Sequence, residues 1–222
     1  MGQSQNSFDP TLVMSSHHIV RDQQEPALII HQVDEFPFHY LQQLLEWSPT
    51  MICCEPAIDY MVSQGIKIDI AIVSFNATDY YNRLLSKQQP IKIISLSQPD
   101  YLSTGLQILQ KEGHSAVNIV TTEVFKFEVI DRLMDFTGLF EIVVWDNDTR
   151  NLILSAKKFQ KWLPEDTMIQ IQPLAGEAAM KTEGFREDLD EVINDETKLM
   201  ILEEGKVSIE CDTPPFMITE YI

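Results

Sequence analysis

Short apolar runs alternate with amphipathic stretches through the first half of the chain. Leu102, Leu106 and Leu109 recur at helical spacing, and Gly113 follows them as a helix end, as Gly65 does for the helical stretch before it. The apolar runs are typical of buried strands, and there are five of them: Ala27 to Ile30, Met51 to Cys54, Ile70 to Val73, Ile91 to Leu96 and Ala116 to Val120. Strands that alternate with helices predict a mostly parallel sheet with helices on both faces.

After Gly138 the pattern changes to paired strands with short turns. Phe140 to Trp145 and Leu152 to Ser155 flank an Asp-Asn-Asp turn and predict a hairpin, and Leu199 to Leu202 with Val207 to Ile209, around Gly205, predict a second one. We therefore expect an α/β fold with three parts: a polar leader over residues 1–25, an α/β domain over 26–138, and a smaller antiparallel β domain over 139–222.

One stretch of the predicted β domain is strongly acidic. Glu183 to Glu196 carries seven acids against the single Arg186. The acids lack the alternate spacing of an EF-hand loop, so the stretch predicts a solvated loop between strands and no calcium site.

Charge and composition narrow the class of partner. The chain has 222 residues with 16 basic and 34 acidic side chains, a net charge of −18, and is long enough to bury a core without metal or disulfide staples. Such a surface repels phosphate backbones and anionic lipids, so we expect neither nucleic-acid nor membrane binding. No apolar stretch approaches the length of a membrane span, and we expect a cytoplasmic protein. Cys53, Cys54 and Cys211 are expected to be buried, reduced thiols, since their spacing fits no metal site.

Ligands of open parallel sheets bind where the strands end, at their carboxyl edge. The residues in these places are polar: Asp34-Glu35, Glu55-Pro56, Ser74-Phe75-Asn76, Gln98-Pro99-Asp100 and Thr121-Thr122-Glu123. None of these segments contains a glycine-rich phosphate loop, which excludes nucleotide binding through a Walker or dinucleotide fingerprint.

Several of these segments resemble the thiamine pyrophosphokinase family. Cys53-Cys54-Glu55-Pro56-Ala57 followed by Gly65-Ile66-Lys67-Ile68-Asp69 is similar to the family's strand ending in Asp-Gly-Ala and its later Gly-x-x-Pro-Asp. Val33 to Pro37 resembles the Asn-Gly-Glu-Phe-Pro of some bacterial members, and Gly184-Phe185-Arg186, Asn194-Asp195-Glu196 and Glu204-Gly205-Lys206 resemble the C-terminal β domain. The resemblance covers residues 26 to 222.

The resemblance implies an activity, its cofactors and an assembly. Family members transfer a pyrophosphoryl group from ATP to the hydroxyl of thiamine, with Mg²⁺ held by aspartates at strand ends. They pair as homodimers through the β domains and build the thiamine pocket across the interface. The resemblance therefore implies a homodimer, to which the apolar C-terminal residues would contribute: Phe216, Met217, Ile218, Tyr221 and Ile222.

Most of the acids that the family motifs need are absent. Glu55 stands where the family's Asp-Gly-Ala motif has its Asp, and Pro56 stands where the motif has its Gly. Because proline has no backbone N–H, this replacement removes an amide donor near the phosphates. The Gly-Asp-x-Asp-Ser motif falls on Val73 to Ala77, so Ser74 and Asn76 replace both metal-binding acids. Glu55 and Asp100 are left as the candidate catalytic and metal-binding residues.

The remaining candidate ligand contacts follow from the same comparison. The family's nucleotide-binding Arg-x-Asp-His segment falls on Lys126 to Val129, and Lys126 and Glu128 keep two of its charge signs. Phe185 corresponds to an aromatic that stacks on the thiamine pyrimidine, although an aromatic after a glycine is typical of a core. The candidate cofactor-binding residues are Ser74, Asn76, Lys126, Glu128, Phe185 and Asn194.

Three functions stay open at this stage. The first is a pseudoenzyme: a family fold in which catalysis is impaired or lost because the magnesium-binding aspartates are replaced. The second is an active thiamine pyrophosphokinase that uses Mg²⁺ and ATP with substituted ligands. In the third, the cleft binds another small molecule through hydrogen-bonding groups, namely Ser74, Asn76, Asp100, Tyr101 and Thr121.

Overall fold

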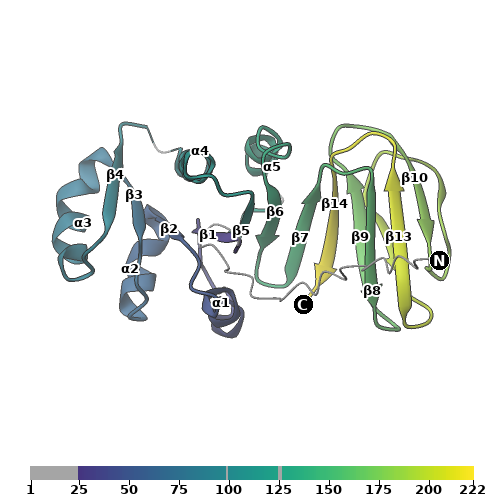
Figure 1. The fold of residues 1–222 in the computed structure, drawn as a ribbon, viewed down its shortest axis with the longest axis horizontal. Coiled ribbons are helices and arrows are strands. Elements are labelled where there is room, and N and C mark those ends of the chain that lie inside the picture. The colour runs from purple at the N-terminus through teal and green to yellow at the C-terminus, as the bar shows by residue number, and fades with distance from the viewer. Residues whose placement is uncertain (1–24, 99, 125–126) are drawn as a thin grey trace, which may run out of the picture.

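A ten-stranded mixed sheet is the main structural element of the molecule (Figure 1). The computed structural model describes residues 25–98, 100–124 and 127–222. The strand order is β12-β9-β14-β7-β6-β5-β1-β2-β3-β4, with β1 to β6 parallel to one another. The strands of its parallel part are β1 (Ala27–Ile30), β2 (Met51–Cys54), β3 (Ile70–Ser74), β4 (Lys92–Leu96), β5 (Ala116–Val120) and β6 (Glu141–Trp145).

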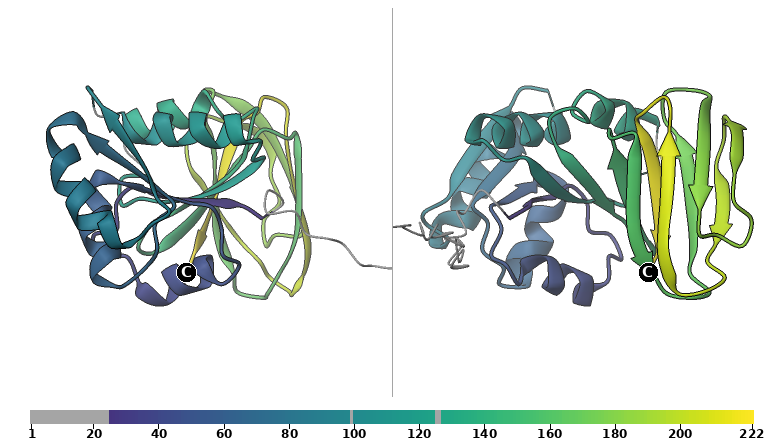
Figure 2. Two further views of the ribbon diagram at one scale, coloured as in Figure 1. Left: turned by 60° about the vertical axis from the view of Figure 1, so that its left-hand side comes forward. Right: turned by 45° about the vertical axis from the view of Figure 1, so that its right-hand side comes forward.

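Helices cover both faces of this parallel part, as the sequence predicts (Figures 1 and 2). On one face α4 (Tyr101–Glu112) and α5 (Phe127–Met134) pack through Leu102, Leu106 and Leu133 against alternate residues of the strands, such as Ile29 and Ile52. On the other face lie α1 (Phe38–Leu45), α2 (Glu55–Ser63) and α3 (Thr78–Leu84), with the 3-10 turns η1 (Phe75–Ala77) and η2 (Leu85–Lys87) before and after α3. None of the helices in the described residues is both long and apolar enough to cross a bilayer.

The C-terminal part is a sandwich of two antiparallel layers, which the right-hand view of Figure 2 shows face to face. One layer continues the large sheet through β7 (Thr149–Leu154), β14 (Phe216–Tyr221), β9 (Met168–Pro173) and β12 (Thr197–Met200). The other is a four-stranded sheet, in the order β11-β10-β13-β8, of β11 (Asp190–Ile193), β10 (Ala178–Glu183), β13 (Gly205–Cys211) and β8 (Lys158–Leu163). Phe216, Ile218 and Ile209 are among the residues that fill the core between them.

The first predicted hairpin is confirmed and joins the two parts. β6 and β7 pair antiparallel, with Val144 opposite Asn151, and β6 also pairs in parallel with β5. The large sheet therefore continues from the α/β part into the β part, across the expected boundary at residue 138. Residues 139–222, all of which the structure describes, contain no helix, in agreement with the predicted β part; the domain boundary itself stays a prediction.

The second predicted hairpin is wrong. β12 pairs with β9 of the large sheet, whereas β13 pairs with β10 and β8 of the small sheet. The short loop between β12 and β13 therefore crosses from one layer to the other. An alternating pattern of apolar and polar residues indicates which face of a strand is buried, but it does not indicate which strand pairs with it. Here Leu199 and Val207 pack in the same core but belong to opposite sheets.

Two other expectations need correction. β11 runs through the acidic stretch that was expected to be a loop only, and it forms an exposed edge of the small sheet. β4, expected to be a buried strand, is the edge of the large sheet and its residues are half-buried or exposed.

Gly184 occupies a position that other residues fit poorly. Its φ of +95° lies in the left-handed region, and a Cβ there would lie 3.0 Å from the carbonyl oxygen of Lys206. We expect Gly184→Ala to lower the free energy of unfolding by about 1–2 kcal/mol. Urea denaturation checks this against Gly138→Ala, where nothing lies within 4 Å of the added Cβ. Equal losses in the two variants would contradict the proposed strain.

Candidate functional site

The carboxyl ends of β2 and β3 are tied together by the side chain of Glu55. Glu55 is the first residue of α2, directly after β2, and its Oε2 accepts a hydrogen bond from the backbone N–H of Ser74 at the end of β3. β2 and β3 are neighbours in the sheet, with Cys54 opposite Ile72. The carboxylate therefore bridges two adjacent strand ends.

A tyrosine hydroxyl from the connection that follows β4 (Lys92–Leu96) completes the contacts of Glu55. Tyr101 begins α4, and its hydroxyl donates to Glu55 Oε2 at 3.3 Å. Burial, followed by the charge of Glu55, raises the pKa of Tyr101 above its usual value, while a hydrogen bond from the Ser74 side chain acts in the opposite direction. The hydroxyl thus keeps its proton at neutral pH and serves as a donor to the carboxylate.

Two further tyrosines anchor the start of α3 to α2. Both donate to the carboxylate of Asp59, Tyr80 at 2.8 Å and Tyr81 at 3.0 Å. Burial and the hydrogen bond to Asp59 raise the pKa of Tyr81, which also lies 3.4 Å from the backbone oxygen of Glu55. These contacts fix α2 and α3 relative to each other, and with them the positions of Glu55 and Ser74.

The candidate Asp100 is engaged elsewhere. Its side chain is exposed and its Oδ1 lies 3.7 Å from Arg132 Nε on α5. Asn76 is exposed on η1 after β3, and Phe75 beside it is 72% exposed. Within the described ranges, no group of three or more His, Cys, Asp or Glu side chains has the arrangement of a metal site.

The remaining candidates are divided between the two ends of the molecule. Glu128 is exposed in the first turn of α5, and Lys126 lies outside the described residues. Phe185 is 7% exposed in the core of the sandwich, and Asn194 is exposed between β11 and β12. Figure 1 places the sandwich at the opposite end of the molecule from β2 and β3. Within one chain, Phe185 and Asn194 are therefore not brought to Glu55.

The sequence did not single out His31, which the structure places at the point where the strand order reverses. Its Nδ1 lies 3.0 Å from the hydroxyl of Thr121, and both residues are buried directly after the neighbouring strands β1 and β5. Thr121 also accepts a hydrogen bond from the backbone N–H of Glu123. The sequence signal that could have identified His31 is its position directly after the apolar run Ala27 to Ile30. Ligands of open parallel sheets bind where the strand order reverses.

The three cysteines are free and buried, as the sequence predicts. Burial raises the pKa values of the Cys53 and Cys54 thiols, so both are protonated and poor nucleophiles at neutral pH. Neither thiol is therefore a candidate catalytic group.

Comparison with known proteins supports the fold. No protein-family model and no curated protein sequence matches the chain. Among solved structures, thiamine pyrophosphokinase from Bacillus subtilis superposes with a TM-score of 0.73 at 11% identity, covering 89% of this chain and 99% of that one. The enzyme from Geobacillus thermodenitrificans gives 0.72 at 8% identity, covering 89% and 98%. Yeast thiamin pyrophosphokinase gives 0.65 at 10% identity, covering 92% and 88%. The chain thus has the thiamine pyrophosphokinase fold over almost its whole described length.

Proposed function

We propose that the chain keeps the thiamine pyrophosphokinase fold as a binding module and has lost, or almost lost, pyrophosphoryl transfer. The observation that carries this proposal is the state of Glu55, whose carboxylate accepts hydrogen bonds from Ser74 N–H and the Tyr101 hydroxyl. A carboxylate oxygen that binds Mg²⁺ is offered to the cation, and here two donors of the protein itself already occupy Oε2 of Glu55.

The neighbouring residues do not fit a magnesium ion either. Ser74 and Asn76 stand where the family motif has acids, and neutral oxygens bind Mg²⁺ far more weakly than carboxylates do. Asp100 is paired with Arg132. A triphosphate would therefore meet this edge of the sheet without the cation that offsets its charge, so we derive no catalytic step through magnesium.

The test is an assay of AMP release from ATP with thiamine and Mg²⁺, together with binding measurements. We expect turnover below detection, or several orders of magnitude below the roughly 10 per second of a typical enzyme. ATP binding should not depend on Mg²⁺, and thiamine bound without ATP would identify the retained ligand. Turnover at an ordinary rate would contradict the proposal and support the active kinase. If neither thiamine nor ATP binds, the binding of a different small molecule is favoured over both other functions.

We also propose a homodimer, formed through exposed apolar residues of the large sheet. Of the expected contributors, Phe216 and Ile218 lie in the chain's own sandwich core, and Met217 packs in the core beneath the helices. These three are therefore not available to a partner. Tyr221 is 46% exposed, next to the cross-strand pair of Met168 and Met200 at 38% and 36%. This exposed apolar row is suited to a second copy.

Sedimentation of a Met168→Lys, Met200→Lys double variant tests the pairing. The natural chain should sediment as a dimer at micromolar concentration and the variant as a monomer. The two lysines reduce the net charge from −18 to −16, so the long-range repulsion between copies does not increase, and dissociation would come from the position of the lysines in the interface. Val192→Lys, on the exposed edge strand β11, is the control and should stay dimeric. A monomeric natural chain would contradict the proposal.

A further inference from the structure

A cavity of about 680 Å³ lies at the edge of the sheet opposite the Glu55 site. It opens where β2, β3 and β4 begin, and its volume is within the range of small-molecule sites. We call it the amino-end cavity, and its lining residues include Glu25, Trp47, Thr50, Asp69, Lys92 and Glu112. None of these residues takes part in the contacts around Glu55.

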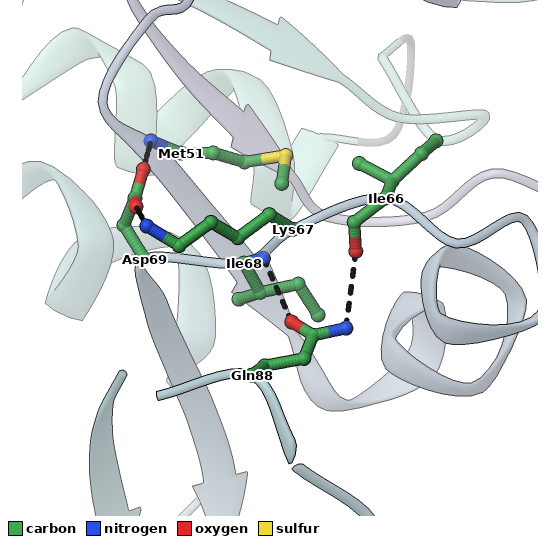
Figure 3. A network of polar contacts seen from close by, with 6 residues as sticks. All are labelled: Met51, Ile66, Lys67, Ile68, Asp69 and Gln88. Atoms are coloured by element: carbon green, nitrogen blue, oxygen red, sulfur yellow. Dashed lines mark hydrogen bonds and ion pairs between the residues drawn. The ribbon is translucent and has the colours of Figure 1, made fainter. Parts of the chain in front are cut away.

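Backbone and side-chain hydrogen bonds hold the floor of the cavity in place. Asp69 Oδ2 accepts from the N–H of Met51 at 3.0 Å, and the backbone oxygen of Asp69 accepts from the N–H of Lys92 at 2.9 Å. Below them Gln88 bridges Ile68 N–H and the Ile66 oxygen, as Figure 3 shows. The starts of three strands are thereby fixed relative to one another, so a ligand would meet a preformed surface.

The charges that face the cavity favour a cation. Its lining has three carboxylates, of Glu25, Asp69 and Glu112, and one ammonium, of Lys92. Lys67 Nζ also lies 3.4 Å from Asp69 Oδ1, as Figure 3 shows, so the formal charge with Lys67 included is −1. Lys92 Nζ lies 3.9 Å from Glu112 and both side chains are largely exposed, so this ion pair is weak. A cationic ligand could therefore reach Glu112 without displacing a strong partner.

An indole supplies the apolar wall. Trp47 lies between α1 and β2 and is 73% exposed. It also borders an adjoining hollow of about 330 Å³, whose wall includes Trp145. The chain itself pairs a cation with the second indole, since Arg150 Cζ lies 5.5 Å from the centre of the Trp145 ring. An exposed indole beside carboxylates favours ligands that combine a positive charge with an apolar body.

We propose that the amino-end cavity binds a small organic cation, with the apolar part of the ligand on Trp47 and its positive charge toward Glu112. The site is separate from the Glu55 site and does not depend on the presence or loss of pyrophosphoryl transfer.

Choline and its neutral isostere 3,3-dimethylbutan-1-ol form a matched pair of probes. They have nearly the same shape and differ in charge. Titration of the full chain, followed by the NMR signal of the Trp47 indole N–H, should show saturable binding of choline and binding of the alcohol at least about fivefold weaker. Raising the ionic strength should weaken choline binding. Equal affinities for the two probes, or no saturable shift with choline, would overturn the proposal.

Variants measured by calorimetry with choline locate the site. Trp47→Leu and Glu112→Gln should each weaken binding by about three- to tenfold. Trp162→Leu is the control, because Trp162 is similarly exposed, at 63%, on β8 at the far end of the molecule. If Trp162→Leu weakens binding as much as Trp47→Leu does, the ligand binds elsewhere and the assignment is wrong. The folding of each variant is checked by its urea midpoint.

Discussion

A variant that restores the missing acids should release AMP from ATP and thiamine at a rate at least about a hundredfold above that of the natural chain. The changes are Pro56→Gly, Ser74→Asp, Asn76→Asp and Ala77→Ser. They add two formal negative charges at the carboxyl end of β3, beside Glu55, where carboxylate oxygens can hold Mg²⁺.

The structure identifies one further change that should add to this gain. In the natural chain Tyr101 donates a hydrogen bond to Glu55. Tyr101→Phe removes this donor and keeps the ring, so Oε2 of Glu55 keeps one donor, the Ser74 N–H, instead of two and is more accessible to a cation. We therefore expect the fivefold-substituted variant to bind Mn²⁺, a paramagnetic substitute for Mg²⁺, more tightly than the fourfold one.

A charge-free counterpart separates electrostatics from shape. It carries Ser74→Asn and keeps Asn76, with the other changes unchanged, so that amides replace both new carboxylates. This control should bind Mn²⁺ weakly and release no AMP. If it matches the restored variant, the two added carboxylates are not the cause of the gain in activity. If the natural chain itself turns over at an ordinary rate, Glu55, Asp100 and Glu128 become the first acids to replace.

Phe216→Ala should remove a large part of the stability of the chain. Phe216 is fully buried in β14, between the two layers of the sandwich, and is among the largest fully buried side chains. Its truncation leaves a cavity and costs about 3–5 kcal/mol. The total stability of a domain is only about 5–15 kcal/mol, so unfolding should begin at much lower urea.

Phe75→Ala is the matched control for this measurement. The same atoms are removed, but Phe75 is 72% exposed on η1, and the expected change is within about 0.5 kcal/mol. Urea denaturation followed by circular dichroism compares the two variants. Similar losses would mean that the sandwich core contributes less than its burial indicates.

The parallel part of the fold could be predicted closely because its signals are local. Met51–Cys54 and Ala116–Val120 are the strands that their apolar runs indicate, and α4 ends at Gly113, whose φ is +85°. Local patterns do not specify partners across distant segments. The assignment of β12 and β13 to one hairpin was wrong for this reason, since both bury apolar residues in one core but belong to different sheets.

The sequence could predict only part of the contacts at the candidate site. The sequence places Glu55 and Ser74 at neighbouring strand ends, and the structure brings them into contact. The contact between Tyr101 and Glu55 joins residues 46 positions apart and depends on how α4 enters the sheet edge. No pattern near either residue encodes it. The pairing of His31 with Thr121, 90 positions apart, is of the same kind.

The position of β14 has a consequence for synthesis on the ribosome. β14 comes after every other strand in the sequence but lies in the interior of the large sheet, between β7 and β9. While the nascent chain still lacks residues 216–221, β7 and β9 have no common partner, and both present unpaired backbone groups. The parallel strands can assemble earlier, whereas the sandwich can close only after β14 has emerged from the exit tunnel. Until then its apolar strands are open to other chains and to chaperones.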